Sequence, residues 1–157
     1  MISKKDWAIT ACLRHNARMK LTDMSRMTGI PVSTLFDRTR FPASLGITRF
    51  SALLDFHKLG FGTCATVLLK AMKPRRDKLR QHLLLSSHVN SLSRINNGYD
   101  FIAECIFRNM KELEEFCEKL EQNYGVREKQ VHFVIEELKR EGFLADETKG
   151  AVEDAWS

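Results

Sequence analysis

The sequence predicts an α+β protein in which a basic helical module precedes a mixed module of helices and strands. Apolar residues recur at helical spacing up to residue 40, whereas extended patterns alternate with helical ones from residue 47 onward. All of the net positive charge lies before residue 47. Periodicity and charge therefore divide the chain at the same place.

The charge excess belongs to the first module alone. The chain of 157 residues contains 25 Lys and Arg and 20 Asp and Glu, which gives a formal net charge of +5. Residues 1–46 hold 8 of these basic and 3 of these acidic side chains, and the other 111 residues hold 17 of each. Such an asymmetry predicts a basic terminal module with an anionic partner.

The overall composition excludes several classes of protein. With 157 residues, 43% of them hydrophobic, the chain can bury a core, so disorder is not expected. No apolar run approaches the roughly 18 residues that cross a bilayer, and the N-terminus has no apolar core of the signal-peptide type. We therefore expect a cytoplasmic protein with no membrane partner.

Neither a metal site nor an active site is expected. Cys12, Cys64, Cys105 and Cys117 are widely spaced in apolar segments, which predicts buried reduced thiols, with a disulfide, metal or redox role as the alternative. The sequence has no phosphate-binding glycine loop, no H-E-x-x-H and no nucleophile elbow, and its histidines are scattered. No catalytic residue, metal ligand or cofactor is predicted.

The first module, residues 1–46, is expected to contain three helices. The first covers residues 5–15, the second begins near Thr22, which is placed to cap it, and the third covers residues 32–40. A short turn containing Gly29 joins the second helix to the third. This arrangement is typical of a helix-turn-helix unit that binds DNA. The alternative is a plain three-helix bundle with a solvated basic face.

The second module, residues 61–140, is expected after a β-linker over residues 47–60 whose strand covers 47–56. Its elements follow the order strand, helix, strand, strand, helix, strand, which is that of the ferredoxin-like βαββαβ unit. The expected strands are 63–69, 88–95, 99–107 and 131–138, and the expected helices are 77–85 and 110–123. Because both faces of the 99–107 strand are largely apolar, a partner sheet is expected to cover one of them. Residues 141–157 are expected to be a polar tail.

Several short motifs follow one another along both modules and the linker. They are Asn16-Ala17-Arg18, Leu21-Thr22-Asp23-Met24-Ser25, Gly29 with Ser33-Thr34-Leu35 and Arg38, Gly46-Ile47, Leu54-Asp55, Leu59-Gly60 and Tyr99-Asp100. In this order, over roughly residues 5–140, they resemble the Lrp/AsnC family of leucine-responsive and asparagine-type regulators.

The resemblance implies a function that the residues alone leave open. It implies a sequence-specific, DNA-binding transcriptional regulator with a helix-turn-helix or winged-helix-like reader, a β-linker and a ferredoxin-like regulatory domain. Such domains pair sheet to sheet into homodimers and form tetramers or octamers, and an amino acid or another small effector modulates them. Two alternatives stay open: a metabolite-sensing oligomer that binds no DNA, and a sirohaem-decarboxylase-like enzyme, whose His-Asn-Tyr signature is missing here.

The residues expected to contact double-stranded DNA fall into two groups. The predicted base readers on the third helix, with Arg38 foremost, are Ser33, Thr34, Asp37 and Arg38. The predicted phosphate contacts are Arg18, Lys20, Thr22 and Arg40. Phe36 and Asp37 stand where members of the family commonly carry basic or polar side chains, so the family's base preference does not transfer to this chain.

The candidate effector site is the loop formed by Asn97, Gly98, Tyr99 and Asp100. Its backbone N–H groups and its carboxylate suit a zwitterionic amino acid. The alternative is a tight turn in which the aspartate caps its own backbone.

Overall fold

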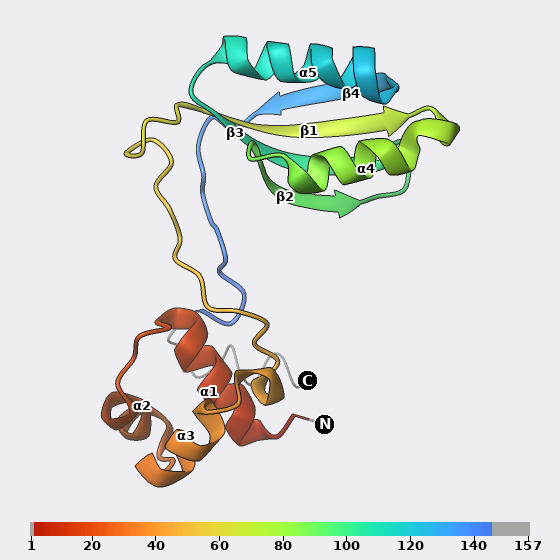
Figure 1. Cartoon of the computed structure of the whole chain (residues 1–157). Helices are drawn as coiled ribbons and strands as arrows, with labels where there is room; N and C mark the ends of the chain where they lie inside the picture. Colours follow the sequence, from red (N-terminus) through yellow and green to blue (C-terminus); the bar gives the residue numbers. More distant parts are fainter. Residues whose placement is uncertain (1, 146–157) are drawn as a thin grey trace. The chain divides into compact units, whose positions relative to one another are not determined.

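The computed structural model describes residues 2–145, which form two compact units (Figure 1). Residues 2–53 together with residues 138–145 make the first unit, and residues 54–137 make the second. Among residues 2–145, no helix is both long enough and apolar enough to cross a membrane. Each unit is a structure in its own right, with its own core.

The first unit is entirely helical over its described residues. It contains α1 (Lys4–His15), α2 (Leu21–Thr28), α3 (Val32–Thr39) and the short 3-10 helix η1 (Pro42–Leu45). One small core holds the helices together, and its buried members are Ile9, Cys12, Met24, Ile30, Leu35 and Leu45. The predicted helix-turn-helix is thus confirmed, and residues 2–53 and 138–145 add no wing of strands to it.

The turn between α2 and α3 forms as the sequence predicts, whereas α2 begins earlier than predicted. Gly29 adopts the left-handed conformation at φ 72° and ends α2, as expected of a glycine C-cap. The expectation that Thr22 caps α2 is wrong, because the helix already begins at Leu21 and its N-cap is Lys20. Lys20 makes no side-chain capping bond. Thr22 is therefore a helical residue with an exposed side chain.

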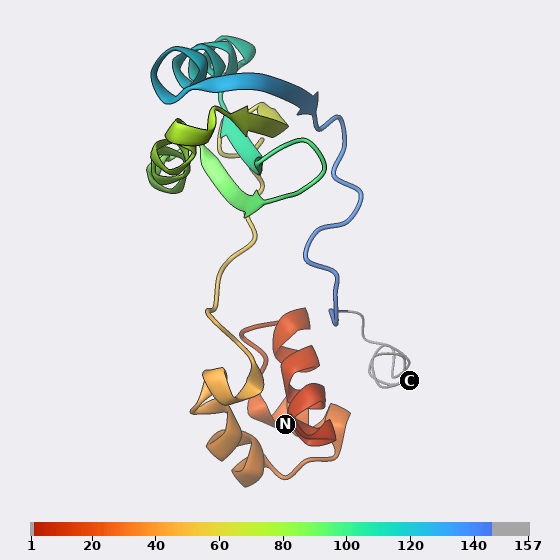
Figure 2. The ribbon, with the colours of Figure 1, turned by 90° about the vertical axis from the view of Figure 1, so that its right-hand side faces the viewer.

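The second unit is a four-stranded antiparallel sheet with two helices on one face, which confirms the ferredoxin-like prediction. Its elements are β1 (Thr63–Ala71), η2 (Lys73–Arg75), α4 (Arg76–Leu85), β2 (Val89–Arg94), β3 (Phe101–Phe107), α5 (Met110–Tyr124) and β4 (Val126–Phe133). The strand order is β2-β3-β1-β4. Figure 2 shows α4 and α5 side by side against the same face of the sheet.

The core of this unit follows the two-residue period of its central strands. On β1, Ala65, Val67, Leu69 and Ala71 are buried beneath the helices, while the residues between them are only half-buried. The pairing of β1 with β3 brings Val67 opposite Ala103, so β3 presents the same alternation. The sheet therefore has one covered face and one face that no helix of residues 54–137 covers.

Two strand predictions are wrong. The strand expected over residues 47–56 is absent: residues 47–55 carry no regular structure and residues 56–60 form a turn, since no described strand pairs with them. The last strand covers Val126–Phe133 rather than 131–138, because Gly125 ends α5 in the left-handed conformation and the strand begins immediately afterwards. The apolar residues after Phe133 had suggested a strand that continued further.

The predicted polar tail lies only partly within the described residues. Arg14 of α1 forms an ion pair with Glu141, and its Nε donates a hydrogen bond to the Phe143 carbonyl oxygen at 3.2 Å. Residues 141–145 thus contact α1 within the first unit. Residues 146–157 lie outside the described residues.

Candidate DNA-binding surface and effector site

Helix α3 is held in the first unit by one buried residue. Leu35 is fully buried in the small core, and no other residue of Val32–Thr39 is buried. Val32, Ser33, Phe36 and Asp37 are exposed. A helix anchored along one line in this way leaves its opposite side free to contact a partner.

The four predicted base readers do not share one direction. Ser33 and Asp37 are exposed one helical turn apart, and Thr34 is half-buried. Arg38 Nη1 lies 3.2 Å from Asp6 Oδ1 of α1, so the guanidinium is directed toward the first helix. The structure thus groups Ser33 with Asp37 and separates Arg38 from them.

Asp6, for which the sequence predicted no role, is the residue that holds Arg38. It is only 6% exposed, and its Oδ2 accepts hydrogen bonds from the Ser3 backbone N at 3.1 Å and from Ser3 Oγ at 2.6 Å. Ser3 Oγ accepts in return from the Asp6 backbone N at 3.2 Å, which completes a capping box at the start of α1. The Ser3 side-chain hydrogen bond, assisted by Arg38, lowers the pKa of the Asp6 carboxyl. The Ser-x-x-Asp spacing at the helix start was the available signal.

The end of α3 carries a second contact that sequence reasoning missed. The guanidinium carbon of Arg40 lies 5.7 Å from the centroid of the Phe36 ring, within the range of a cation–π interaction. Both side chains are exposed. Arg40, which was expected to contact phosphate, is thus held beside the outward face of α3.

The other predicted phosphate contacts lie at the beginning of α2. Arg18, Lys20 and Thr22 are all exposed, and the Arg18 backbone N donates to Asn16 Oδ1 at 2.9 Å. Lys20, at the N-cap, stands where backbone N–H groups point out of the helix. A phosphate placed there meets both a cationic side chain and the positive end of a helix.

Residues 97–100 belong to the loop between β2 and β3, whose pairing ends at Arg94 and Phe101. Asn97 has φ 64° and Gly98 has φ 97°, and these positive angles reverse the chain within the loop, at the turn that the sequence predicted. Both residues are exposed, while Tyr99 is half-buried.

Asp100 joins this loop to the rest of the sheet. Its Oδ2 accepts a hydrogen bond from the Ala71 backbone N at 2.9 Å, and its Oδ1 lies 2.8 Å from Arg76 Nη2. The side chain is 14% exposed. The aspartate therefore does not cap its own backbone, as the alternative reading supposed. It binds the end of β1 and the start of α4, and both of its oxygens have partners.

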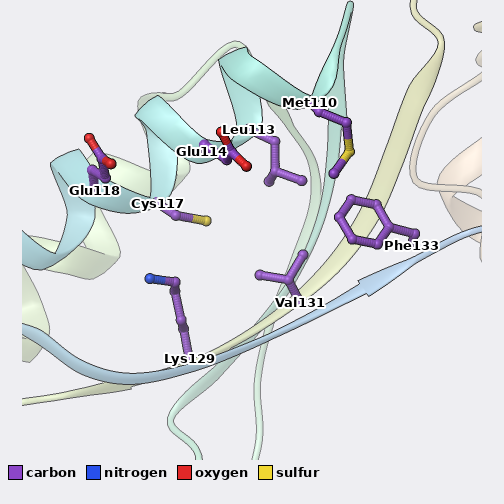
Figure 3. A pocket seen from close by; sticks show the side chains of 8 residues that line it. All are labelled: Met110, Leu113, Glu114, Cys117, Glu118, Lys129, Val131 and Phe133. Atoms are coloured by element: carbon purple, nitrogen blue, oxygen red, sulfur yellow. The ribbon is translucent and has the colours of Figure 1, made fainter.

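A groove lies between α5 and the edge strand β4 of the second unit (Figure 3). Its volume is about 340 Å³. The lining residues are Met110, Leu113, Glu114, Cys117, Glu118, Lys129, Val131 and Phe133. Figure 3 shows an apolar group at one end, near Phe133, and the Lys129 ammonium near Cys117 at the other. Lys129 also forms an ion pair with Glu121.

The face of the sheet away from the helices is partly apolar. Leu68 pairs with Ile102 and Cys64 pairs with Ile106 across β1 and β3 on this face. Leu68 and Ile102 are half-buried within the single chain, although no helix of the unit covers them. This is the two-sided strand that the sequence predicted.

Cys12, Cys105 and Cys117 are buried, as predicted, whereas Cys64 is half-buried. Burial raises the pKa of the Cys105 thiol to about 12. Within residues 2–145, no group of His, Cys, Asp and Glu is arranged to hold a metal ion.

Residues 64–144, more than half of the chain, match a family described as the Lrp/AsnC ligand binding domain. An uncharacterised HTH-type transcriptional regulator of Pyrococcus furiosus is 21% identical over 141 residues, which cover 89% of this chain and 95% of that protein. An HTH-type transcriptional regulator of Pyrococcus horikoshii is 25% identical over 122 residues, which cover 77% and 81% respectively.

Solved structures share the fold over most of the chain. A transcriptional regulator of Neisseria meningitidis, solved as a complex with L-Met, superposes with a TM-score of 0.81 at 21% identity and covers 89% of this chain and 94% of its own. LrpC of Bacillus subtilis superposes with a TM-score of 0.78 at 16% identity and covers 88% and 98%.

Proposed function

Because the chain belongs to the Lrp/AsnC family, we propose that it is a sequence-specific DNA-binding transcriptional regulator of that type, which works in the cytoplasm and catalyses no reaction. One observation carries the proposal: a single chain combines a basic helix-turn-helix unit, whose third helix is exposed along one side, with a ferredoxin-like domain of this family. The relatives named above are also transcriptional regulators.

In this proposal α3 enters the major groove with its exposed side. Ser33 and Asp37 then face base edges, and Asp37 accepts a hydrogen bond from a cytosine amine. Arg18, Lys20 and Arg40 contact phosphates and fix the register of the unit on the duplex. The module charge of +5 steers the protein toward DNA of any sequence.

The second unit supplies the homodimer. The uncovered face carrying Leu68, Ile102 and Ile106 packs against the same face of a second copy, since a symmetric pair brings like apolar patches together. A dimer presents two α3 helices to a pseudopalindromic site. Tetramers or octamers form from such dimers.

An amino acid is the proposed effector, and two places on the second unit suit one. The regulator of Neisseria meningitidis has been solved with L-Met, which supports this class of ligand. At the hairpin, Asn97 and Gly98 are exposed, whereas Asp100 is already occupied by Ala71 and Arg76. In the α5–β4 groove, Lys129 and Glu114 offer partners for a carboxylate and an ammonium beside an apolar floor.

Selection of genomic fragments bound by the full chain tests the DNA-binding proposal. We expect the selected fragments to share a pseudopalindrome with half-sites about 10 bp apart or a multiple of that distance, bound at least about 10³-fold more tightly than random DNA. Ser33→Glu places a carboxylate on the exposed side of α3 and abolishes the selection. Ser87→Glu, an exposed serine of the second unit, is the matched control and leaves the selection intact. Binding equal to that of random DNA contradicts the proposal.

Calorimetric titration with a panel of amino acids tests the effector proposal. If Tyr99→Ala abolishes the heat of binding and Lys129→Ala does not, the ligand binds at the hairpin. If Lys129→Ala abolishes the heat and Tyr99→Ala does not, the ligand binds in the groove. An absence of heat with every amino acid contradicts an amino-acid effector. If amino acids bind but no DNA is selected, the chain is a metabolite-sensing oligomer instead.

A further inference from the structure

Two large apolar side chains lie on the exposed side of α3. Val32 is 42% exposed and Phe36 is 53% exposed, and they are one helical turn apart, so they form one apolar strip. The fold gives no reason for it, because Leu35 already connects α3 to the core and is fully buried. An exposed aromatic side chain on an otherwise satisfied short helix points to a partner that covers it.

The surroundings of this strip identify the chemistry of that partner. Arg40 is placed over the Phe36 ring at 5.7 Å, and residues 1–46, which include α3, carry a net charge equal to the whole positive excess of the chain. An apolar strip with a cation beside it fits a surface that has apolar groups next to negative charges. The major groove of DNA is such a surface wherever thymine presents its C5 methyl group between two phosphate backbones.

The geometry of α3 also distinguishes Phe36 from Arg38. The two residues are two positions apart, about 200° round the helix, and Arg38 is turned toward Asp6 of α1. Phe36 instead lies on the same side as Ser33 and Asp37, which are also exposed. A helix that presents Ser33 and Asp37 to base edges therefore presents Phe36 with them.

We propose that Phe36, supported by Val32, contacts thymine methyl groups in the major groove and so selects thymine in each half-site of the operator. Arg40, held against the Phe36 ring, contacts the phosphate beside that thymine. This inference rests on the proposed function, because it names the bases that the same DNA-binding surface selects.

Replacing each thymine of a selected operator by deoxyuridine, one position at a time, tests the inference, since uracil lacks only the methyl group. For the wild-type chain we expect one or two positions in each half-site at which Kd rises about three- to tenfold, because burial of one methyl group corresponds to roughly a fourfold change. Phe36→Ala weakens binding to the thymine operator and no longer distinguishes uracil from thymine at those positions. Phe36→Leu, which keeps an apolar contact, retains the discrimination.

Phe41→Ala is the matched control, because Phe41 is also exposed, at 66%, but follows the end of α3. It keeps the uracil profile of the wild type, and circular dichroism verifies that all variants are folded. Tight operator binding that is indifferent to uracil at every position overturns the inference and leaves the proposed function standing. A Phe36→Ala variant that changes the oligomeric state while keeping the uracil profile also overturns it, in favour of self-association through α3. An absence of any selected operator overturns the proposed function itself.

Discussion

Arg38 of α3 and Asp6 of α1 form an ion pair within the first unit, with Arg38 Nη1 3.2 Å from Asp6 Oδ1. The aspartate side chain is 8% exposed, and the arginine side chain is 53% exposed. Asp6 Oδ1 is buried and accepts no hydrogen bond, so the arginine is its charge partner. The helix expected to read DNA is thus tied to the capping box at the start of α1.

Arg38→Ala is expected to lower the free energy of unfolding of the helical unit by about 1 kcal/mol, because half of the pair is solvated and the other half is buried. The sequence alone predicts that Arg38→Ala loses operator affinity and keeps its fold. The ion pair predicts that the same variant is also less stable. Urea unfolding followed by circular dichroism measures it.

A matched control for Arg38 exists on α2. Arg26, whose side chain is 80% exposed, pairs with Asp23 at 3.4 Å, so Arg26→Ala should leave the stability unchanged. A double-mutant cycle of Arg38→Ala with Asp6→Asn isolates the pair. No coupling between the two substitutions contradicts a stabilising role, and an operator affinity unchanged in Arg38→Ala removes Arg38 from the base readers.

The capping box makes the stability of the helical unit dependent on pH. The hydrogen bond from the Ser3 side chain, together with Arg38, lowers the pKa of Asp6 below the ordinary value of 3.8. A carboxyl whose folded pKa is lowered stabilises the fold fully above its unfolded pKa, and this contribution is lost as the pH falls through the folded value. The wild type should therefore exceed Asp6→Asn in stability at pH 6, by a margin that shrinks as the pH falls below about 4. A margin independent of pH contradicts this expectation.

Asp100→Asn tests whether the hairpin aspartate is structural. The carboxylate accepts from Ala71 N at 2.9 Å and pairs with Arg76 at 2.8 Å while only 14% exposed. Its loss should lower the stability of the second unit by about 2 kcal/mol, as for a charged hydrogen bond in a largely buried place. Asp77→Asn, an exposed aspartate one residue after Arg76, is the control. Equal stabilities of the two variants contradict the structural role.

The elements that the sequence predicted correctly are those whose patterns are local. The turn before α3 follows from Gly29, and the β2–β3 hairpin follows from the Asn97-Gly98 pair, since each conformation depends on one or two residues. The order of elements in the second unit follows from periodicity alone. The position of α3 is also predicted correctly, because its helical spacing is a local pattern.

What the sequence could not predict depends on contacts between distant residues. The Arg38–Asp6 ion pair and the Asp100–Ala71 hydrogen bond join residues about 30 positions apart, so sequence spacing alone does not indicate them. Arg38 and Asp100 were both predicted to contact a ligand, because the sequence does not show whether the partner of a charged side chain lies inside the protein or outside it. The prediction of a strand over residues 47–56 was wrong for a related reason, because strand propensity does not show whether a neighbouring strand is present to pair with.

The uncovered face of the sheet predicts how the proposed dimer can be broken. Leu68→Asp places a carboxylate among apolar side chains on both copies, so the dimer Kd should rise at least roughly 100-fold. Analytical ultracentrifugation measures the change. Leu85→Asp is the matched control, because Leu85 is 88% exposed at the end of α4, away from this face. A Leu68→Asp protein that remains dimeric locates the dimer interface elsewhere.

Lys20→Ala distinguishes a phosphate contact from a base contact. Lys20 is exposed at the N-cap of α2, where a bound phosphate would meet its ammonium and the free N–H groups of the helix. The substitution should weaken binding to operator and random DNA by the same factor, and reduce the slope of log K against log salt by about one unit. Lys119→Ala, an exposed lysine of α5 in the other unit, should leave the slope unchanged. Because a base contact weakens binding to the operator alone, a loss confined to one sequence assigns Lys20 to base reading instead.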